Sequence, residues 1–396
     1  MRPRKIDFLY TNIGRGHPHY LDGIAEALVR SKEIGLVRGQ SDVFEISHDI
    51  SRMGWRFVRW LYCIGSQPGP FESFYERLRH RADYNRQGLV LKLLGRDIRR
   101  RYSSTEDPLV VAHPTLVGLL AGRANLIYQH GELVVPREAI VKGASTVLVP
   151  TPECAQSFLQ AGYANEQVFV SGLGVESALV QQADNCFSER ISRYQKRSSL
   201  VGLFVSSGAE PRNHVDLICR AIRSVIEEGG CVLILAQAGG RLITTGRRAL
   251  SQSGVNPTFA EPADNIPLEM PRALIAAYNN RRQETVLTSR LFPWVDYLVA
   301  PAHERTNWSA GLGLPMFVLT PDKGSFAPLN HRLLLGQGTA RTIADSHQAG
   351  QLGQDLKRLA ESGELAEMAQ AGWGRYPIDG FARIAAYLVQ KYAPRG

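Results

Sequence analysis

The chain has 396 residues and a formal net charge of +9; 44% of its residues are hydrophobic and 21% are charged. This composition is that of a globular protein and excludes disordered and fibrous chains, and the length predicts two domains. The five cysteines lie far apart and form no CxxC pair. They argue against a disulfide framework and a structural zinc site, and they indicate a reducing compartment.

No stretch has the roughly 20 apolar residues of a membrane span. The best candidate, 109–122, is short and contains His113 and Pro114. The apolar run at 6–10 is too short for the hydrophobic segment of a secretion signal. We therefore expect a cytoplasmic protein that could touch the inner face of a membrane.

The first half of the chain alternates short apolar runs with helical patterns. Residues 5–10 predict a strand, a glycine turn follows, and 19–29 predict an amphipathic helix. Further runs predict strands at 41–46, 109–112, 126–128, 145–149 and 168–171, and a helix at 152–161. This order is typical of a doubly wound α/β domain, expected over 1–175.

The polar residues 176–199 are expected to link this domain to a second one over 200–376. There the apolar runs predict strands at 200–205, 231–236, 286–288, 297–300 and 316–319, with a helix at 214–228. A last amphipathic helix is expected within 377–396. Doubly wound sheets hold ligands at the carboxyl ends of their strands, so the reaction site is expected in a cleft between the domains.

The glycine turn Gly14-Arg-Gly16-His17 stands where the first strand enters the first helix. Glycines let a ligand approach the backbone, and an imidazole can take a proton from an attacking hydroxyl. The alternative is that His17 only caps the helix on a turn that needs glycine for its geometry.

Residues 52–101 contain 12 Lys or Arg against 4 Asp or Glu, with eight interleaved aromatic residues. Such a stretch can lie on an anionic membrane and dock a lipid acceptor. It could also bind nucleic acid, although no nucleic-acid module accompanies it, or be a set of solvated helix faces with aromatics in the core.

Several motifs occur in the order found in one family. The chain resembles the two-domain GT-B glycosyltransferases, most closely the branch of monogalactosyldiacylglycerol synthases and the lipid II N-acetylglucosaminyltransferase. The motifs are the glycine turn with His17, Val110-Val-Ala-His113-Pro114, 144–151 with 168–174, and Trp294-Val-Asp296 leading to Gly311-Leu-Gly-Leu-Pro315, Asn330 and Gly336-Gln-Gly338.

The resemblance implies metal-independent inverting transfer of a sugar from a nucleotide diphosphate, most often UDP, without a cofactor. The first domain would bind the acceptor, the second the donor, and the C-terminal helix would return to the first domain. His17 would be the base, and the amides of Ser206, Ser207 and Gly208 would face the diphosphate. The other implied donor contacts are Leu291 and Phe292 at the nucleobase and Asp322, Lys323 and Gly324 at the sugar. The alternative for 322–324 is an ordinary solvated loop.

The chain departs from this family where a Glu usually binds the ribose hydroxyls. That position holds Trp308, which could equally be packing, and the nearby polar residues are Glu304, Thr306 and Asn307. Asn307 could hydrogen-bond the ribose. The departure leaves open a different donor or an inactive member of the family.

Three polar residues at predicted strand ends complete the candidate acceptor site. His113 and His130 each follow a strand, and either could instead be structural. Glu132 is an alternative base, because a carboxylate in a closing cleft can have a raised pKa.

The sequence therefore predicts a GT-B glycosyltransferase with a lipid-linked or membrane-associated acceptor. The alternatives are a transferase with a soluble natural-product or protein acceptor, a nucleotide-sugar epimerase of the same fold, and a binding protein without turnover.

Overall fold

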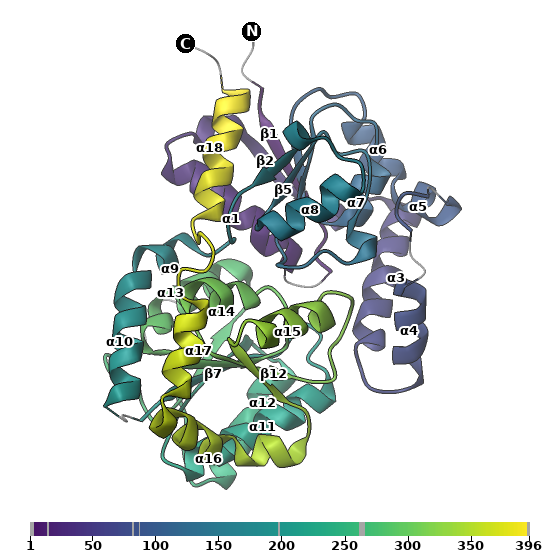
Figure 1. The fold of residues 1–396 in the computed structure, drawn as a ribbon. Helices are drawn as coiled ribbons and strands as arrows, with labels where there is room; N and C mark the ends of the chain where they lie inside the picture. Colours follow the sequence, from purple (N-terminus) through teal and green to yellow (C-terminus); the bar gives the residue numbers. More distant parts are fainter. Residues whose placement is uncertain are drawn as a thin grey trace. The chain divides into compact units, whose positions relative to one another are not determined.

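The computed structural model describes residues 4–13, 16–80, 83–86, 88–196, 199–260 and 266–393. The chain divides into two compact units: unit 1 comprises Met1–Ser177 and Pro377–Gly396, and unit 2 comprises Ala178–Tyr376. Each unit is built on one parallel sheet that carries helices (Figure 1). The predicted fold class, two doubly wound α/β units with a C-terminal helix that belongs to the first, is confirmed.

The sheet of unit 1 has six parallel strands in the order β2-β1-β3-β4-β5-β6. Its strands are β1 (Ile6–Tyr10), β2 (Val37–Asp42), β3 (Leu109–Val111), β4 (Leu126–Gln129), β5 (Thr146–Val149) and β6 (Val168–Val170). Strands β3, β4 and β5 are buried throughout, as expected for a sheet covered on both faces. Because all pairings are parallel, the carboxyl ends of these strands share one edge.

Two helices from distant parts of the chain pack together on unit 1: α1 (Gly16–Arg30) and α18 (Gly380–Tyr392) lie side by side (Figure 1). Tyr20, Ile24 and Phe381 are buried in their common core. A Cβ at Gly23 would lie 2.2 Å from the Phe381 ring, so only glycine lets the two helices approach this closely. The last helix thus completes the core of the first unit.

The run 41–46, expected as a strand, changes structure in its middle. Strand β2 ends at Asp42, and Val43–Ile46 form the short helix α2. Asp42 Oδ1 accepts a hydrogen bond from the Phe44 N–H (3.1 Å), and Glu45 reaches back to the Asp42 N–H. This capping box overrides the strand propensity of the apolar residues.

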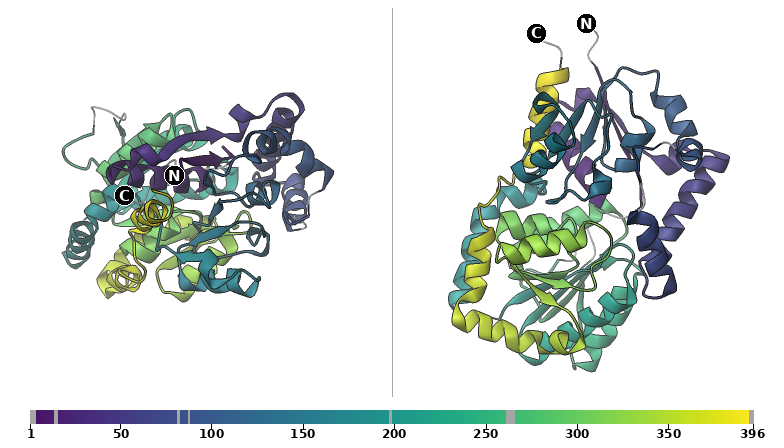
Figure 2. Two further views of the ribbon diagram at one scale, coloured as in Figure 1. Left: turned by 90° about the horizontal axis from the view of Figure 1, so that it is seen from above. Right: turned by 45° about the vertical axis from the view of Figure 1, so that its right-hand side comes forward.

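The basic aromatic stretch forms four helices: α3 (Asp49–Gly65), α4 (Pro70–His80), α5 (Leu89–Leu94) and α6 (Arg96–Tyr102). Helices α3 and α4 run side by side as a hairpin (Figure 2). Trp55 anchors α3, because its buried indole donates to the Leu94 carbonyl (3.2 Å). The remaining helices of unit 1 are α7 (Pro114–Leu119) and α8 (Pro152–Gln160).

The sheet of unit 2 has seven parallel strands in the order β13-β12-β11-β7-β8-β10-β9. They are β7 (Val201–Phe204), β8 (Cys231–Gln237), β9 (Thr258–Ala260), β10 (Ala273–Tyr278), β11 (Tyr297–Ala300), β12 (Met316–Leu319) and β13 (Ala340–Ile343).

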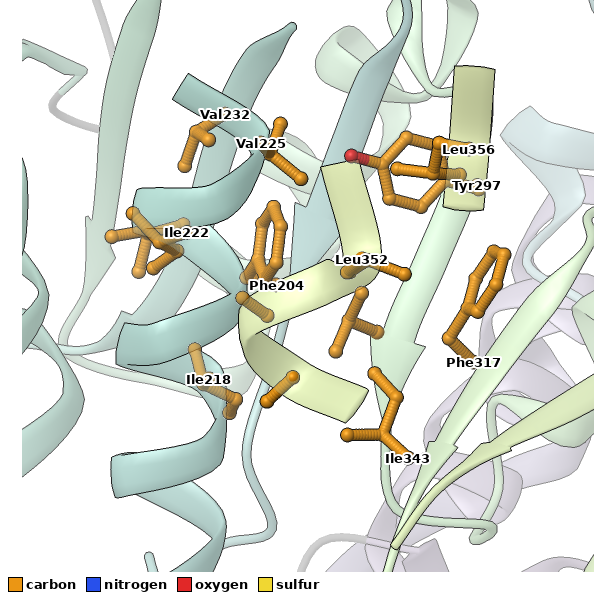
Figure 3. Packing of buried hydrophobic residues seen from close by; sticks show 14 of the residues in the cluster. Phe204, Ile218, Ile222, Val225, Val232, Tyr297, Phe317, Ile343, Leu352 and Leu356 are labelled. Atoms are coloured by element: carbon orange, nitrogen blue, oxygen red, sulfur yellow. The ribbon is translucent and has the colours of Figure 1, made fainter. Parts of the chain in front are cut away.

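Helices pack on this sheet through one large apolar core. The strongest helix pairing joins α11 (Arg212–Glu227) to α16 (Ser346–Ser362). Figure 3 shows Ile218 and Ile222 of α11 and Leu352 of α16 meeting Phe204 and Phe317 of the sheet. Unit 2 also contains α12 (Arg241–Gln252), α14 (Thr306–Leu312), α15 (Ala327–Gly336) and α17 (Glu364–Gly372).

Two predicted elements of the second half take another form. Residues 286–288, expected as a strand, lie inside helix α13 (Arg281–Leu291), which Asn280 caps through the Gln283 N–H (3.0 Å). Most of 176–199, expected as a linker, forms α9 (Ser177–Gln181) and α10 (Ala183–Gln195). The buried Arg190 of α10 donates to the Leu312 carbonyl (2.9 Å), so this helix is part of unit 2.

None of the helices within the described ranges combines the length and the apolar character that a membrane crossing requires.

Candidate functional site

The carboxyl edge of unit 1 gathers residues that follow three neighbouring strands. His17 lies in the first turn of α1, after β1, while His113 follows β3 and Glu132 follows β4. The rings of His17 and His113 meet edge to face, with centroids 4.6 Å apart. The predicted site residues His17 and His113 are therefore brought together, as the strand order requires.

The position of His113 at the start of a helix determines which ring nitrogen carries the proton. It is the N-cap of α7, and its Nδ1 accepts a hydrogen bond from the Thr115 N–H (3.1 Å). A ring nitrogen that accepts is unprotonated, so the neutral ring carries its proton on Nε2. His113 thus combines a structural role as a helix cap with its place beside His17.

His130 is a buried histidine at 2% exposure. Its Nε2 donates to the Val134 carbonyl (3.0 Å), and the rings of Tyr128 and Phe158 lie around it. Burial lowers the pKa of His130 to about 4, so the ring is neutral at pH 7. Its contacts are those of a structural residue.

Three other residues were expected on this edge: Gly14, Gly16 and Glu132. Gly16 is the first residue of α1, whereas Gly14 lies outside the described residues. Glu132 is 9% exposed and lies in the loop after β4.

In unit 2, the expected donor residues follow the central strands β7, β11 and β12, which are neighbours in the sheet. Ser206, Ser207 and Gly208 form the turn between β7 and α11. Within the described part of the chain, the buried Ser206 hydroxyl has no hydrogen-bond partner, although such groups are normally paired. The turn therefore offers a polar side chain as well as backbone amides to a ligand.

The loop Asp322–Gly324 is held against α11 by a histidine that sequence reasoning missed. The fully buried His214 of α11 hydrogen-bonds through Nε2 to the Pro321 carbonyl (2.9 Å). Burial lowers the pKa of His214 to about 4. A histidine at a helical position whose neighbours are apolar was the available signal. This contact brings the loop after β12 to the helix that follows Ser206–Gly208.

A second missed histidine orders Asp322 itself. Asp322 Oδ2 accepts a hydrogen bond from His331 Nδ1 (3.0 Å), and His331 Nε2 pairs with the Thr342 hydroxyl (2.8 Å). Lys323 beside it is only 7% exposed, and Gly324 has a positive φ of 79°. Asp322 is thus part of a hydrogen-bond network, and Lys323 is buried rather than solvated.

The segment after β11 contains a buried ion pair. Arg305 donates to Glu284 of α13 (2.7 Å), and the predicted site residue Glu304 lies 3.4 Å from the same guanidinium. Thr306 and Asn307 are buried at the start of α14.

Trp308, which stands where a ribose-binding Glu was expected, is a packing residue. It is 2% exposed, lies edge to face with Phe292, and is covered by the Arg305 guanidinium 5.4 Å from its ring centre.

Leu291 and Phe292 do not lie where a nucleobase contact was expected. They end α13 just before β11, so they lie at the amino edge of the parallel sheet, opposite to the loops after β7, β11 and β12. Their side chains are 2% and 1% exposed. The loop that does reach the carboxyl edge near this position is Asn279–Asn280, after β10.

Among the described residues, no group of three or more His, Cys, Asp and Glu side chains is arranged to hold a metal ion.

The comparisons with known proteins identify the fold. Neither the models of known protein families nor the curated proteins match this sequence. Among solved structures, S. aureus MnaA in complex with UDP is 15% identical with a TM-score of 0.55, over 98% of this chain and 96% of that one. The UDP-GlcNAc 2-epimerase of Neisseria meningitidis bound to UDP-GlcNAc is 10% identical with a TM-score of 0.51, over 98% of both chains.

LpCGTa in complex with UDP is 11% identical with a TM-score of 0.50, over 99% of this chain and 100% of that one. These likenesses show that the chain has the GT-B fold, as the resemblance predicted. The narrower resemblance to the monogalactosyldiacylglycerol synthase and lipid II branch receives no support from these structures.

Proposed function

We propose that the protein is a glycosyltransferase that moves a sugar from a UDP-sugar to a hydroxyl group of a lipid-linked or membrane-associated acceptor. Similar structures contain UDP or a UDP-sugar, which favours a UDP-sugar as the donor. In this proposal unit 2 binds the donor and unit 1 binds the acceptor.

The reaction is an inverting displacement at the anomeric carbon, without a metal or other cofactor. The acceptor oxygen forms a bond to that carbon while its proton passes to His17, with Glu132 as the alternative base. The bond from the carbon to the diphosphate breaks, and UDP leaves with the electron pair. The amides of Ser206–Gly208 stabilise the charge that develops on the diphosphate.

The remaining polar residues of unit 2 orient the donor. Glu304, Thr306 and Asn307 would hydrogen-bond the ribose, and Asp322, Lys323 and Gly324 would contact the sugar. His113 and the backbone at Gly16 would orient the acceptor beside His17.

One observation carries the choice of a membrane acceptor: the α3–α4 hairpin exposes large apolar side chains. Met53, Phe57 and Trp60 of α3 are 65%, 57% and 49% exposed, and Phe71 and Phe74 of α4 are 58% and 54% exposed. Exposed apolar side chains of this size can mark a membrane interaction site, and arginines beside them add about 1 kcal/mol each near an anionic bilayer. We call this surface the hairpin face.

Vesicle sedimentation tests the hairpin face. The protein is expected to sediment with vesicles of phosphatidylglycerol and phosphatidylcholine at low salt, and Phe57→Ser with Phe71→Ser should reduce the bound fraction. Leu268→Ser, which removes a side chain that is 99% exposed in unit 2, is the matched control and should bind like the wild type. A protein that stays in the supernatant with anionic vesicles would disprove the membrane acceptor.

The same fold also supports a second candidate, a nucleotide-sugar epimerase, because UDP-GlcNAc 2-epimerases are among the similar structures. Radiolabelled UDP-sugars, UDP-GlcNAc first, distinguish the two candidates. Transfer moves the label into the organic phase only when membrane lipids are present. Epimerisation converts the UDP-sugar itself, with or without lipid, and would overturn the transferase.

A further inference from the structure

A pocket of about 750 Å³ opens in unit 1 at the carboxyl edge of the sheet. Asn12, which follows β1, and Asp42, which ends β2, form its wall on the side of the sheet. Helices α2 and α3 supply the rest of the lining: Phe44, Glu45, Arg52, Arg56, Arg59, Trp60 and Cys63. Its volume is in the range of small-molecule sites.

The arginines of the pocket come from one face of α3. Arg52, Arg56 and Arg59 follow the spacing i, i+4, i+7, which places them above one another on a helix. The Arg52 Nε donates to the Ser47 carbonyl (2.8 Å), and the Arg59 guanidinium lies 5.9 Å from the centre of the Phe44 ring. These contacts hold two of the three guanidinium groups near the pocket.

The two carboxylates of the pocket are already engaged in the cap of α2. Asp42 Oδ1 accepts from the Phe44 N–H and Glu45 Oε2 from the Asp42 N–H. The three guanidinium groups outnumber them and are suited to bind an oxyanion through paired N–H groups.

We propose that this pocket binds a phosphate group carried by the acceptor. A phosphate ester has three acceptor oxygens and can accept from all three guanidinium groups, whereas a carboxylate has only two oxygens. The inference that the pocket binds a phosphate group rests on the residues that line it. The inference that this phosphate belongs to the acceptor rests on the proposed function.

The surroundings of the pocket agree with this ligand. Asn12 follows β1, and the candidate base His17 lies at the start of α1, the next helix, so a bound phosphate lies on the same sheet edge as His17. Trp60 lines the pocket and also stacks on Phe57 of the hairpin face, with ring centroids 5.6 Å apart. An apolar chain attached to a phosphate in the pocket can therefore extend over Phe57.

Cys63 provides a reporter inside the pocket. It is an exposed thiol that lines the pocket, whereas Cys154 and Cys186 are buried. The alkylation rate of Cys63 by iodoacetamide, followed by peptide mass spectrometry, is measured with and without inorganic pyrophosphate as the probe. We expect pyrophosphate to slow the modification of Cys63 several-fold.

Variants assign this protection to the arginines. Arg56→Gln with Arg59→Gln should abolish the protection, and Arg56→Gln alone should weaken it. The matched control, Lys92→Gln with Arg96→Gln, removes the same charge from exposed positions of α5 and α6 that do not line the pocket, and should keep the protection. A Cys63 rate that pyrophosphate does not change, or equal loss in both double variants, would overturn the proposal.

Two further probes identify the source of the phosphate. Protection of Cys63 by phosphatidylglycerol vesicles, but not by phosphatidylcholine vesicles, assigns it to a lipid headgroup. Protection by glycerol phosphate and pyrophosphate alone assigns it to a soluble acceptor. Calorimetry with UDP tests the donor proposal separately. If UDP does not bind, the proposed UDP-sugar donor is wrong, but the protection of Cys63 still tests the phosphate pocket.

Discussion

The carboxyl edges of the two sheets hold their polar side chains in different ways. In unit 2 several of these groups are bonded to one another, as in the Arg305–Glu284 ion pair and the contact of His331 with Asp322. In unit 1, His17 is half-buried, and Arg56 and Arg59 are exposed above an open pocket. The edge of unit 2 is thus ordered when the protein folds, which lowers the entropy lost on binding a ligand of constant shape. At the edge of unit 1, the exposed arginine side chains can change conformation when a ligand binds.

The comparison predicts that a substitution at the carboxyl edge of unit 1 can lower activity without lowering the stability of the protein. His17→Ala should lower kcat by about 10²–10⁴-fold, because it removes proton transfer but little packing. Its melting temperature and its affinity for UDP should stay near those of the wild type. Transfer kinetics and calorimetry check this, and a variant with unchanged kcat would remove His17 from the mechanism.

A substitution at the carboxyl edge of unit 2 should instead lower the stability of the protein. Arg305→Met should lower the free energy of unfolding by about 3–5 kcal/mol, because it leaves Glu284 buried without its cation. Urea denaturation gives this value. Arg341→Met serves as the control, because it breaks a half-exposed pair with Glu364 and should cost about 1 kcal/mol or less. Equal losses in the two variants would contradict the contrast between the edges.

Both edges share one feature, a buried neutral histidine, so acid should weaken both units. The pKa values of His130 and His214 are lowered to about 4 from the ordinary 6.5. Between pH 6.5 and pH 4 the unfolded chain binds protons at these positions and the folded chain does not, so the free energy of unfolding falls as the pH falls. The loss is at most about 3 kcal/mol for each histidine.

His214→Asn tests the share of unit 2 in this pH dependence. The variant should be less stable at pH 7 but should lose less stability between pH 7 and pH 4.5 than the wild type. Urea denaturation at the two pH values is the measurement, and equal losses in both proteins would show that His214 does not titrate in this window.

The smallest effect is expected at the far end of the Asp322 network. Thr342→Val removes the hydroxyl that pairs with His331 and should cost about 0.5–1.5 kcal/mol. If the network orients Asp322 for the donor sugar, affinity for the UDP-sugar should fall several-fold while affinity for UDP does not. An equal fall for both ligands would separate Asp322 from sugar binding.

Much of the fold follows from local sequence signals. The strands at 297–300 and 316–319 were predicted with their observed bounds, because each is a compact apolar run between breakers. The prediction of a strand at 286–288 was wrong, because three residues are too few to show the helical period that continues through Glu284 and Leu291. Strand β10 was missed, because its alanines lack strand propensity.

The errors in the site follow from those in the fold. The resemblance implied a nucleobase contact for Leu291 and Phe292, and a strand at 286–288 would have placed them at the carboxyl edge. The helix reverses the direction of the chain and places them at the opposite edge. His17 and His113 were found because each follows a correctly predicted strand. The arginine pocket was not, because it joins Asn12, Asp42 and α3, which only tertiary packing brings together.

The return of α18 to unit 1 has a consequence for how the protein is made. The segment that fills the space beside α1 is translated only after the whole of unit 2. At about 5–20 residues per second, the first unit must wait on the order of 10–40 s for it. During that interval the apolar face around Tyr20 and Ile24 has no cover from Phe381. The unit that is synthesised first is therefore completed last, and on the ribosome it is the part most in need of a chaperone.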